Sequence, residues 1–565
     1  MSTVAEYIVG QLAAWGVRHV YGVVGDTFFP FMDAIAGQEQ LRFVPVRHEA
    51  AAGLMASAEA KLTGRLAVCV ATSGPGIANL INGLGDAYAD RAPVLAITGQ
   101  VEMKQIATNA KQYVDQQALV RPLAGFTELL VHPDAAGTVL PAALRTALGE
   151  ERVAHLSVPK DLWAMACKAE VTPPEPFLGA APCPDEATLD GALQRMREAR
   201  RPLLLVGQGA RPARDAIMAL AEKWGAGVIH SMPAIGVVPW SHPLALGGLG
   251  AGGSDAAHAA LQEADLLLTI ACNWWPAKHA PEHLPVVKVD RQPVAVGGKM
   301  EVCYGVPGLA EAVVPRLAEG APGEQRSQWR ARLTELKAQW QAKVDEETGG
   351  GPAPDGIGQA PGGIGPAPAP AGIGPAPAGI GPAPAMPPQQ IIRILEQSLP
   401  PDAIIALDTG DHTVWFNRIF GGTAHEILVS GRWRTLGFGL PAALAAKLCC
   451  PDRTVAALVG DTGLQSLLGE LTTAADLGLP ITIVVVNNGE MAIERNRVIT
   501  QGHTKLGTAP RTPDFVAVAQ ACGLNALRAT TPTDLQQALN EARDAKGPVL
   551  IDAAATAPVA PTSQG

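Results

Sequence analysis

The sequence has few aromatic and few charged residues, and it lacks long apolar runs. Phe, Trp and Tyr make up 4% of its 565 residues and charged residues 17%, whereas 47% are hydrophobic and 61 residues are glycine. Few aromatics and many small residues favour helices packed closely on sheets over an aromatic-rich β-sandwich. The apolar runs are too short to cross a bilayer, and the start MSTVAEYIVGQL lacks the basic region and cleavage site of a signal peptide. We therefore expect a globular protein without stable membrane association.

Positive charge and paired cysteines are also scarce. The formal net charge is −10, which argues against contact with nucleic acid phosphates. The eight cysteines form no CxxC pair and no zinc-ligand spacing. The adjacent Cys449 and Cys450 could form a redox switch, although most such thiols are structural. A reducing, cytoplasmic location fits this pattern best.

The order of apolar runs predicts the fold class. A chain of this length exceeds one hydrophobic core. Short apolar runs alternate with helical patterns, which predicts an α/β protein with three doubly wound parallel-sheet domains. The expected domains are 1–168, 184–318 and 389–556. Their expected strands are VRHVYGVVG, LRFVPVRH, LAVCVATSG, APVLAITGQ, VAHLSVPKD; RPLLLVGQG, GAGVIHS, ADLLLTIAC, PVVKVD; AIIALDTG, EILVS, TVAALVGD, ITIVVVNN, ALRATT and PVLIDAAA.

The third domain is preceded by a low-complexity segment at 346–388. It repeats GIGPAPA-like units and has almost no charge and no aromatic residue. Glycine does not recur at every third position, which excludes a collagen helix. This composition predicts a flexible linker with local polyproline character.

The densest chemical signal is VAALVGDTGLQSLLGELTTAADLGLPITIVVVNNGEMAI. One strand ends in Gly460–Asp461 and the next in Asn487–Asn488, and the strands of a parallel sheet end at the same edge, where ligands bind. The carboxylate and amide oxygens of these two residues suit Mg²⁺, with a main-chain carbonyl as a third ligand. Gly460 and Gly463 would let backbone N–H groups approach a phosphate. The same residues are also ordinary turn formers, so on this segment alone both interpretations stay open.

These motifs resemble those of thiamine diphosphate enzymes, over nearly the whole chain outside the linker. RHEAAAGLMASAEAKLTG and VATSGPGIANLINGLGDAYADRAPVLAITGQ are similar to the domain that binds the cofactor's pyrimidine ring. TLGFGLPAALAAKL, GDTG and NN are similar to the diphosphate-binding domain, and the motifs match the pyruvate oxidase and acetolactate synthase group. The resemblance implies thiamine diphosphate and Mg²⁺, with the metal bound by the Asp461 and Asn488 side chains and the Glu490 carbonyl. Thr462 departs from the signature, which has glycine there.

Glu49 lies in LRFVPVRHEAAAGLMA, where a strand meets a helix. Taken alone, a glutamate in the first turn only stabilises the helix dipole. The resemblance implies that Glu49 hydrogen-bonds the pyrimidine N1′, and an apolar site disfavours its charged form, so it could donate or share a proton. The imino tautomer that this favours deprotonates the thiazolium C2, which then attacks the substrate carbonyl. In this family Glu49 and the diphosphate site come from different subunits, which implies a homodimer or homotetramer.

The resemblance assigns further residues to the cofactor site. Leu436 would be the apolar wedge between the cofactor rings, although it could also be ordinary core, and Gln112 would line the active site. The other residues that the resemblance places near the cofactor are Gly25, Asp26, Gly74, Pro75, Asn79, Gly410, His412, Gly460, Thr462, Gly463, Asn488 and Ile493.

The middle segment is similar to a flavin-binding domain in the order of its motifs. The candidate FAD contacts are Gly207, Gly248, Gly250, Gly253, Asn273 and Asp290. A glycine-rich turn is a weak signal. NWWPAK also replaces the RFDDR-like segment typical of acetolactate synthases. FAD is therefore an open alternative.

The residues after NN bear on the reaction. Glu494 matches a proton-handling glutamate of pyruvate decarboxylase-like enzymes, although it could be a solvated helix charge. The leading expectation is decarboxylation of a small 2-oxo acid such as pyruvate, in the manner of a pyruvate oxidase or quinone-linked pyruvate dehydrogenase. The alternatives are an acetolactate synthase-like carboligase, a non-oxidative decarboxylase and an inactive cofactor-binding relative.

Overall fold

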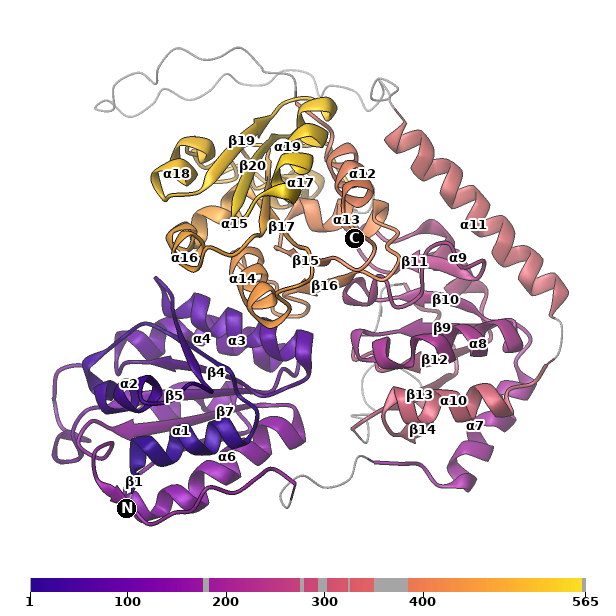
Figure 1. The fold of residues 1–565 in the computed structure, drawn as a ribbon. Coiled ribbons are helices and arrows are strands. Elements are labelled where there is room, and N and C mark those ends of the chain that lie inside the picture. The colour runs from indigo at the N-terminus through magenta and orange to yellow at the C-terminus, as the bar shows by residue number, and fades with distance from the viewer. Residues whose placement is uncertain are drawn as a thin grey trace.

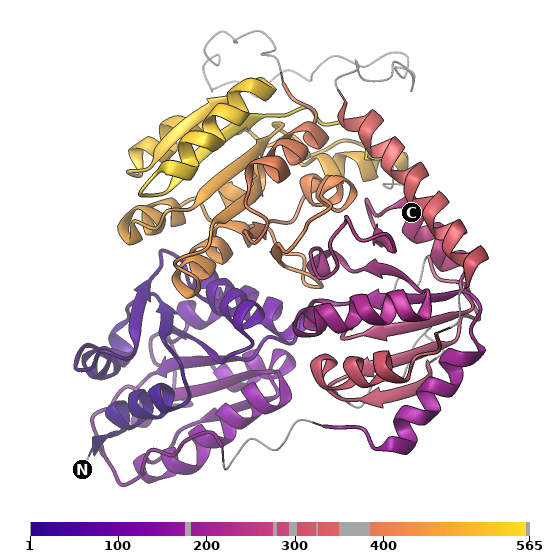
Figure 2. The ribbon, with the colours of Figure 1, turned by 45° about the vertical axis from the view of Figure 1, so that its right-hand side comes forward.

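Three six-stranded parallel sheets form the body of the protein. The computed structural model describes residues 2–175, 182–274, 279–292, 302–323, 326–349 and 385–560. Helices pack on the sheets, and each sheet with its helices forms one domain (Figures 1 and 2). The predicted α/β class with three doubly wound sheets is confirmed. No helix in the described ranges has the length and apolar character needed to cross a bilayer.

The first domain has the strand order β3-β2-β4-β5-β7-β6. Its strands are β2 (His19–Gly22), β3 (Arg42–Pro45), β4 (Ala67–Ala71), β5 (Val94–Gln100), β6 (Phe126–Leu129) and β7 (Val153–Pro159). Its helices are α1 (Val4–Ala14), α2 (Phe29–Ala36), α3 (Glu49–Thr63), α4 (Pro75–Ala89), α5 (Gln116–Val120) and α6 (Ala136–Glu150). A short antiparallel pair, β1 (Ser2–Thr3) with β8 (Ala166–Cys167), fastens the start of the chain.

The third domain repeats the strand order of the first, as β16-β15-β17-β18-β20-β19. Its strands are β15 (Ile404–Leu407), β16 (Glu426–Val429), β17 (Val455–Gly460), β18 (Thr482–Asn487), β19 (Asn525–Ala529) and β20 (Val549–Ala554). Its helices are α12 (Pro388–Ser398), α13 (Asp411–Ile419), α14 (Gly439–Cys449), α15 (Asp461–Ser466), α16 (Glu470–Leu477), α17 (Ala492–Thr500), α18 (Phe515–Ala521) and α19 (Pro532–Asp544). All six predicted strands of this domain are present.

The middle domain has a different order, β11-β10-β9-β12-β13-β14, which is typical of dinucleotide-binding folds. Its strands are β9 (Pro202–Val206), β10 (Gly227–His230), β11 (Ala245–Gly248), β12 (Leu266–Ile270), β13 (Val286–Asp290) and β14 (Val302–Pro307). Its helices are α7 (Glu186–Glu198), α8 (Arg214–Trp224), α9 (Asp255–Glu263), α10 (Ala310–Gly320) and α11 (Ser327–Thr348).

Most of the predicted linker, 350–384, lies outside the described residues. Its first residues belong to the end of α11. Near its other end, Met386 forms a parallel bridge with Ala555 beside β20. The boundaries of the linker and of the domains otherwise stay predictions.

Close helix packing joins the first and third domains. Within the first domain α3 lies against α4, and a Cβ on Gly83 would come within 2.5 Å of the Gly53 backbone, so only glycine permits this approach. The face of α3 also packs on α14, and apolar residues of both domains share one buried cluster. These contacts fix α3, which begins with Glu49, against the third domain.

Candidate active site

The strand order of the third sheet predicts where a ligand binds. β15 and β17 are hydrogen-bonded neighbours, and the next strands on either side are β16 and β18, so the order reverses between β15 and β17. In open parallel sheets ligands bind beyond the carboxyl ends of the strands at such a point. The segments that follow these two ends are DTGDH and DTG, which contain Gly410, His412, Asp461 and Gly463.

His412 fills the space between the two glycines of this edge. Its buried imidazole Nε2 lies 3.0 Å from the Asp408 carbonyl oxygen. A Cβ on Gly410 would come within 2.7 Å of the ring and one on Gly460 within 3.2 Å, so both positions favour glycine. Burial lowers the pKa of His412 to about 4, and its ring is therefore neutral at neutral pH. The structure thus brings three predicted residues together.

Asp461 ties the loop after β17 to the loop after β18. Its Oδ2 accepts hydrogen bonds from the backbone N–H groups of Gly489 at 2.7 Å and Asn488 at 3.2 Å. Its Oδ1 accepts from the backbone N–H and the hydroxyl of Thr462. Burial raises the pKa of this carboxyl, while the N–H donors oppose the rise. A buried carboxylate beside an amide side chain suits a hard cation.

Asn488 and Glu490 also lie at this edge. The Asn488 side-chain oxygen accepts from the backbone N–H of Glu490 at 3.0 Å, and the Glu490 carboxylate pairs with Arg495. The Thr462 hydroxyl, which stands where the family signature has glycine, is 3.1 Å from Asp461. Metal binding by Asp461, Asn488 and the Glu490 carbonyl stays a prediction that this arrangement fits.

Buried polar atoms without partners surround the same edge. Among the described residues, the Thr409 hydroxyl, Asp411 Oδ1 and Gln465 Nε2 are buried and make no hydrogen bond. Each such group costs about 1–3 kcal/mol unless a ligand, an ion or water satisfies it. Burial raises the pKa of Asp411 to about 6, although the Trp415 indole N–H on its other oxygen and the charge of Arg495 oppose the rise. A polar ligand at this edge would remove these penalties, so the residues present fit a metal-bound diphosphate.

Asp408 is a residue of this site that sequence reasoning missed. It follows β15, and its fully buried carboxylate accepts from the backbone N–H groups of Gly437 at 3.0 Å and Phe438 at 3.2 Å. Burial raises its pKa to about 7 against the effect of these donors. The only sequence signal was its place after a buried strand, since its partners lie in another segment of the chain.

Leu436 comes directly before the residues that Asp408 anchors. Its side chain is half-buried, and among the described residues it belongs to none of the hydrophobic core clusters. This placement is unlike that of an ordinary core leucine and agrees with the predicted apolar wedge. The wedge role itself stays a prediction.

Glu49 begins α3 and is buried in the first domain. Its carboxyl is 8% exposed, and Asn79 Nδ2 donates to its Oε2 at 3.0 Å. A Cβ on Gly76 would come within 3.3 Å of Oε1, so glycine leaves space beside this oxygen. The structure therefore brings two predicted residues together, Glu49 and Asn79, and leaves one carboxyl oxygen facing a glycine.

The loops around Glu49 hold other predicted residues. Gly74 precedes α4 with φ of +67°, and a Cβ there would lie 2.9 Å from the Gln112 carbonyl oxygen. Gln112 itself has a φ of +64°, a backbone conformation that is uncommon outside glycine. Pro75 is the first residue of α4. Such strain collects at ligand sites.

Gly25 and Asp26 lie on the loop after β2. Gly25 packs against Thr72, because a Cβ there would come within 2.6 Å of the Thr72 Cβ. Asp26 turns outward and pairs with Lys160 at 2.8 Å. Gly25 therefore packs against the loop before α4, whereas the Asp26 carboxylate lies in a surface ion pair.

The residues around Glu49 and those around Asp461 form two separate clusters. Among the hydrogen bonds and ion pairs of the described residues, none joins Glu49 to Asp461. Glu470 of the third domain contacts the segment just before α3, where its Oε1 accepts from the backbone N–H groups of Arg47 and His48 at 3.0 Å each. The two halves of the predicted site are thus each preorganised.

The residues after NN lie on α17. Glu494 is half-exposed and pairs with Arg497 at 2.8 Å, one turn along the helix. Ile493 is partly buried against the core of the middle and third domains. The structure thus places Glu494 in a solvated ion pair of this chain, and its catalytic role stays a prediction.

A large cavity lies where the three domains meet. It has a volume of about 780 Å³, and its lining includes four of the six predicted FAD contacts, Gly207, Gly250, Asn273 and Asp290. Gly207 and Asn273 follow β9 and β12, the strands at which the order of the middle sheet reverses. Asp290 ends β13 and is buried.

Two glycines shape the wall of this cavity. A Cβ on Gly207 would meet the Ala271 carbonyl oxygen at 1.9 Å, and Gly250 has a φ of +88° beside the Trp274 ring. Gly248 and Gly253 do not line the cavity. A Cβ on Gly248 would come within 2.5 Å of the Asn417 side chain, and one on Gly253 would lie 2.5 Å from the Gly248 carbonyl oxygen. The rest of NWWPAK, 275–278, lies outside the described residues.

Comparison with known proteins agrees with this geometry. Three family models match the chain: thiamine pyrophosphate enzyme, N-terminal TPP binding domain, at 2–119; central domain at 189–317; and C-terminal TPP binding domain at 408–553. The putative thiamine pyrophosphate-containing protein YdaP of Bacillus subtilis is 31% identical over 97% of this chain and 91% of its own length.

Two further relatives have named activities. The acetolactate synthase large subunit of Corynebacterium glutamicum is 31% identical over 97% of this chain and 86% of its own length. The sulfoacetaldehyde acetyltransferase of Rhodobacter capsulatus is 29% identical over 96% of this chain and 91% of its own length. The resemblance found in the sequence motifs is thereby confirmed, and the chain belongs to the thiamine pyrophosphate enzyme family.

Proposed function

We propose that this protein cleaves a small 2-oxo acid with thiamine diphosphate and Mg²⁺ and transfers the remaining acyl fragment to an acceptor. The observation that carries the proposal is the buried Glu49 carboxyl, held by Asn79 on one oxygen and bordered by Gly76 on the other. When bound, thiamine diphosphate supplies the electron sink for loss of CO₂ from such acids.

The roles of the chain's own residues follow from their places. Asp461 and Asn488 would hold the metal by side chain, with the Glu490 carbonyl as a further ligand. The glycines at the end of β17 would admit the diphosphate beside the buried, neutral His412. Glu49 would hold a proton at the pyrimidine ring, in a pocket where burial limits competition from water.

Transfer is favoured over aldehyde release by two observations. Relatives that align over nearly the whole chain are named acetolactate synthase and sulfoacetaldehyde acetyltransferase, and the second name describes transfer of an acetyl group. Glu494, the residue that would protonate the product in a simple decarboxylase, is half-exposed and paired with Arg497.

A second candidate is the oxidase-like reaction that the sequence motifs first suggested. Its support is the cavity lined by Gly207, Gly250, Asn273 and Asp290, which has the size and the switch-point position of a dinucleotide site. FAD bound there would favour oxidation of the acyl fragment, although flavin would not by itself exclude transfer. The reaction product therefore decides between the two.

The test is a panel of 2-oxo acids, with and without a second 2-oxo acid or phosphate as acceptor. CO₂, free aldehyde, condensation products, acyl phosphate and dye reduction are measured, and the absorbance spectrum reports flavin. Acceptor-dependent condensation, which needs no oxidant, supports the proposal, whereas acyl phosphate formed from a 2-oxo acid requires a two-electron oxidant and supports the second candidate. Dye reduction by a yellow protein supports the second candidate, and absence of CO₂ release with every acid would contradict both.

A further inference from the structure

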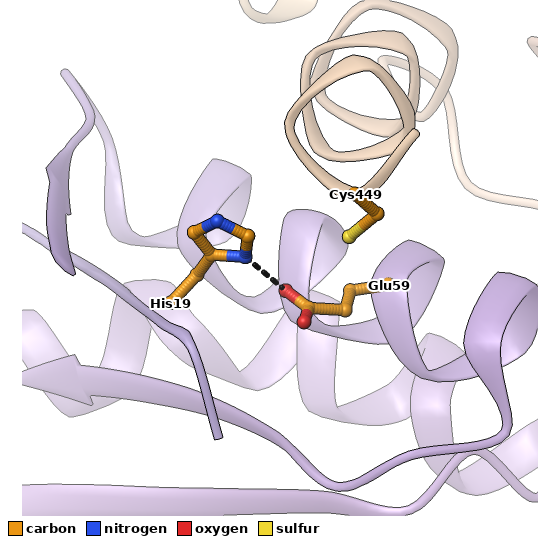
Figure 3. A group of neighbouring side chains, drawn as sticks. All are labelled: His19, Glu59 and Cys449. Carbon is orange, nitrogen blue, oxygen red and sulfur yellow. Dashed lines mark hydrogen bonds and ion pairs between the residues drawn. The ribbon is translucent and has the colours of Figure 1, made fainter. Parts of the chain in front are cut away.

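A group of metal-binding side chains lies away from the proposed active site. His19 begins β2, Glu59 lies on α3 and Cys449 ends α14, so the group spans the first and third domains (Figure 3). One ligand atom from each residue lies within 4.8 Å of the other two. Glu59 is ten residues beyond Glu49, or about 15 Å along α3 at the rise of an α-helix.

The group is shielded from water. Glu59 is 2% exposed and His19 9%, whereas Cys449 is half-buried. His19 Nδ1 lies 3.2 Å from Glu59 Oε2, and the Tyr21 hydroxyl donates to the same oxygen at 2.5 Å. His19 and Tyr21 are thus the polar partners of Glu59, and a cation beside these groups would further offset the cost of burying them.

The donor set favours one kind of ion. A thiolate, an imidazole and a carboxylate are the ligands of Zn²⁺, whereas Mg²⁺ prefers oxygen alone. Zinc with three protein ligands accepts water as its fourth, which the half-buried side of Cys449 would admit. Tetrahedral bonds of about 2.0–2.3 Å place ligand atoms roughly 3.3–3.7 Å apart. Atoms that now lie up to 4.8 Å from one another must therefore move together on binding. The Tyr21 hydroxyl would remain bonded to Glu59 and orient it, as residues behind metal ligands do.

We propose that His19, Glu59 and Cys449 bind a Zn²⁺ ion that ties the first domain to the third. On binding, the Cys449 S–H bond breaks, its proton leaves to solvent and a Zn–S bond forms, with no change of oxidation state. The ion would fix the far ends of α3 and α14. The near end of α3 carries Glu49, and α14 begins three residues after Leu436.

The test uses the full chain loaded with thiamine diphosphate and Mg²⁺, freed of other metals and titrated with Co²⁺ as a spectroscopic stand-in for Zn²⁺. We expect one Co²⁺ per chain, a sulfur-to-cobalt charge-transfer band and displacement by one equivalent of Zn²⁺. Cys449→Ala should lose the band, and His19→Gln should weaken binding at least tenfold. Cys450→Ala is the matched control, because it removes the adjacent thiol outside the group and should leave the titration unchanged.

Thermal unfolding gives a second readout. Zn²⁺ should raise the midpoint of the parent and of Cys450→Ala but not of Cys449→Ala, since an ion that binds only the folded state stabilises it. Binding that survives Cys449→Ala, binding lost in Cys450→Ala, or no Co²⁺ band in the folded parent would overturn the proposal. Because the assay needs no turnover, its result is independent of the proposed reaction.

Discussion

Glu49 is the residue whose surroundings make the sharpest prediction. Within the part of the chain that the structure describes, Asn79 is its one side-chain donor, and a Cβ on Gly76 would lie 3.3 Å from its other oxygen. Glu49→Gln keeps the size and the hydrogen bond but removes the acidic proton. We expect cofactor binding to be kept and turnover of the best 2-oxo acid to fall about 10²–10⁴-fold, the usual contribution of a proton-transfer group.

The measurements for this prediction are the thiamine diphosphate affinity and the rate of CO₂ release. Glu39→Gln removes the same charge from an exposed position and should retain the parent rate. Near-normal turnover in Glu49→Gln would show that the proton is handled elsewhere.

At this scale the sequence predicts residue types better than partners. Asp461 and Asn488 were expected together because both follow strands of one sheet, and the structure places them in hydrogen-bond contact. Asp408 was missed because its carboxylate binds N–H groups in the loop before α14, and no local sequence pattern reveals that contact. For Glu494 the position in the motif was clear, but its partner Arg497 is an ordinary neighbour on the same helix.

The loop before α14 contacts both the third and the first domain of the chain. On one side Asp408 holds the N–H groups of Gly437 and Phe438. On the other, the Thr435 hydroxyl accepts from Asn82 of α4 at 2.9 Å. Leu436 lies between these two anchors, so its position is fixed from both domains.

Removing the first anchor tests this arrangement. Asp408→Ala leaves backbone N–H groups buried without an acceptor, at about 1–3 kcal/mol each. We expect a lower midpoint of thermal unfolding and weaker thiamine diphosphate binding, because the loop with Leu436 loses its fixed position. Asp402→Ala, an exposed aspartate before β15, is the control. An unchanged cofactor affinity in Asp408→Ala would mean that the loop is held by its other contacts.

Three strands of the main sheets that the sequence did not predict share one position in their sheets. β6, β11 and β14 were not expected as strands, and each is an edge strand of its sheet. An edge strand is covered on fewer sides, so it needs no continuous apolar run. β6 is only half-buried, and β11 reads ALGG with little side chain to show a pattern. Central strands such as β17, buried along nearly its whole length, were predicted because burial requires apolar residues.

At the scale of the whole molecule, the Glu49 cluster and the Asp461 cluster must come together to form one active site. Glu49 and Asp461 make no direct contact in this chain, and we expect each cluster to meet its counterpart from a second copy across a two-fold interface. Glu49→Gln and Asp461→Ala should each be inactive alone, the second through loss of Mg²⁺-dependent cofactor binding. A mixed dimer of the two would then contain one intact site and one doubly altered site.

Mixing the two variants therefore tests the shared site. After dissociation and random reassembly, about a quarter of the parent activity should return, since half of the dimers are mixed and each has one working site. Co-expression with two affinity tags and purification of the mixed dimer gives the same comparison. No recovery in a confirmed mixed dimer would place both clusters of a site in one chain.

Buried histidines should make the free energy of unfolding of this protein depend on pH. Burial lowers the pKa of His155 to about 3 and that of His230 to about 4. His155 lies between the hydroxyls of Thr98 and Thr127, 2.8 Å from each, and is neutral in the folded chain. In the unfolded chain a histidine titrates near 6.5. Below that pH the unfolded state binds more protons than the folded state, so the free energy of unfolding decreases as the pH is lowered.

We therefore expect full histidine-linked stability above about pH 6.5 and a decreasing free energy of unfolding as the pH falls from there toward 4. The measurement is the urea midpoint between pH 8 and 5. His155→Gln can keep a hydrogen bond to a threonine but has no titrating ring, so its free energy of unfolding should be lower at pH 8 and depend less on pH. His132→Gln, at an exposed position, should retain the parent slope. Equal slopes in the parent and in His155→Gln would assign the acid sensitivity to other groups.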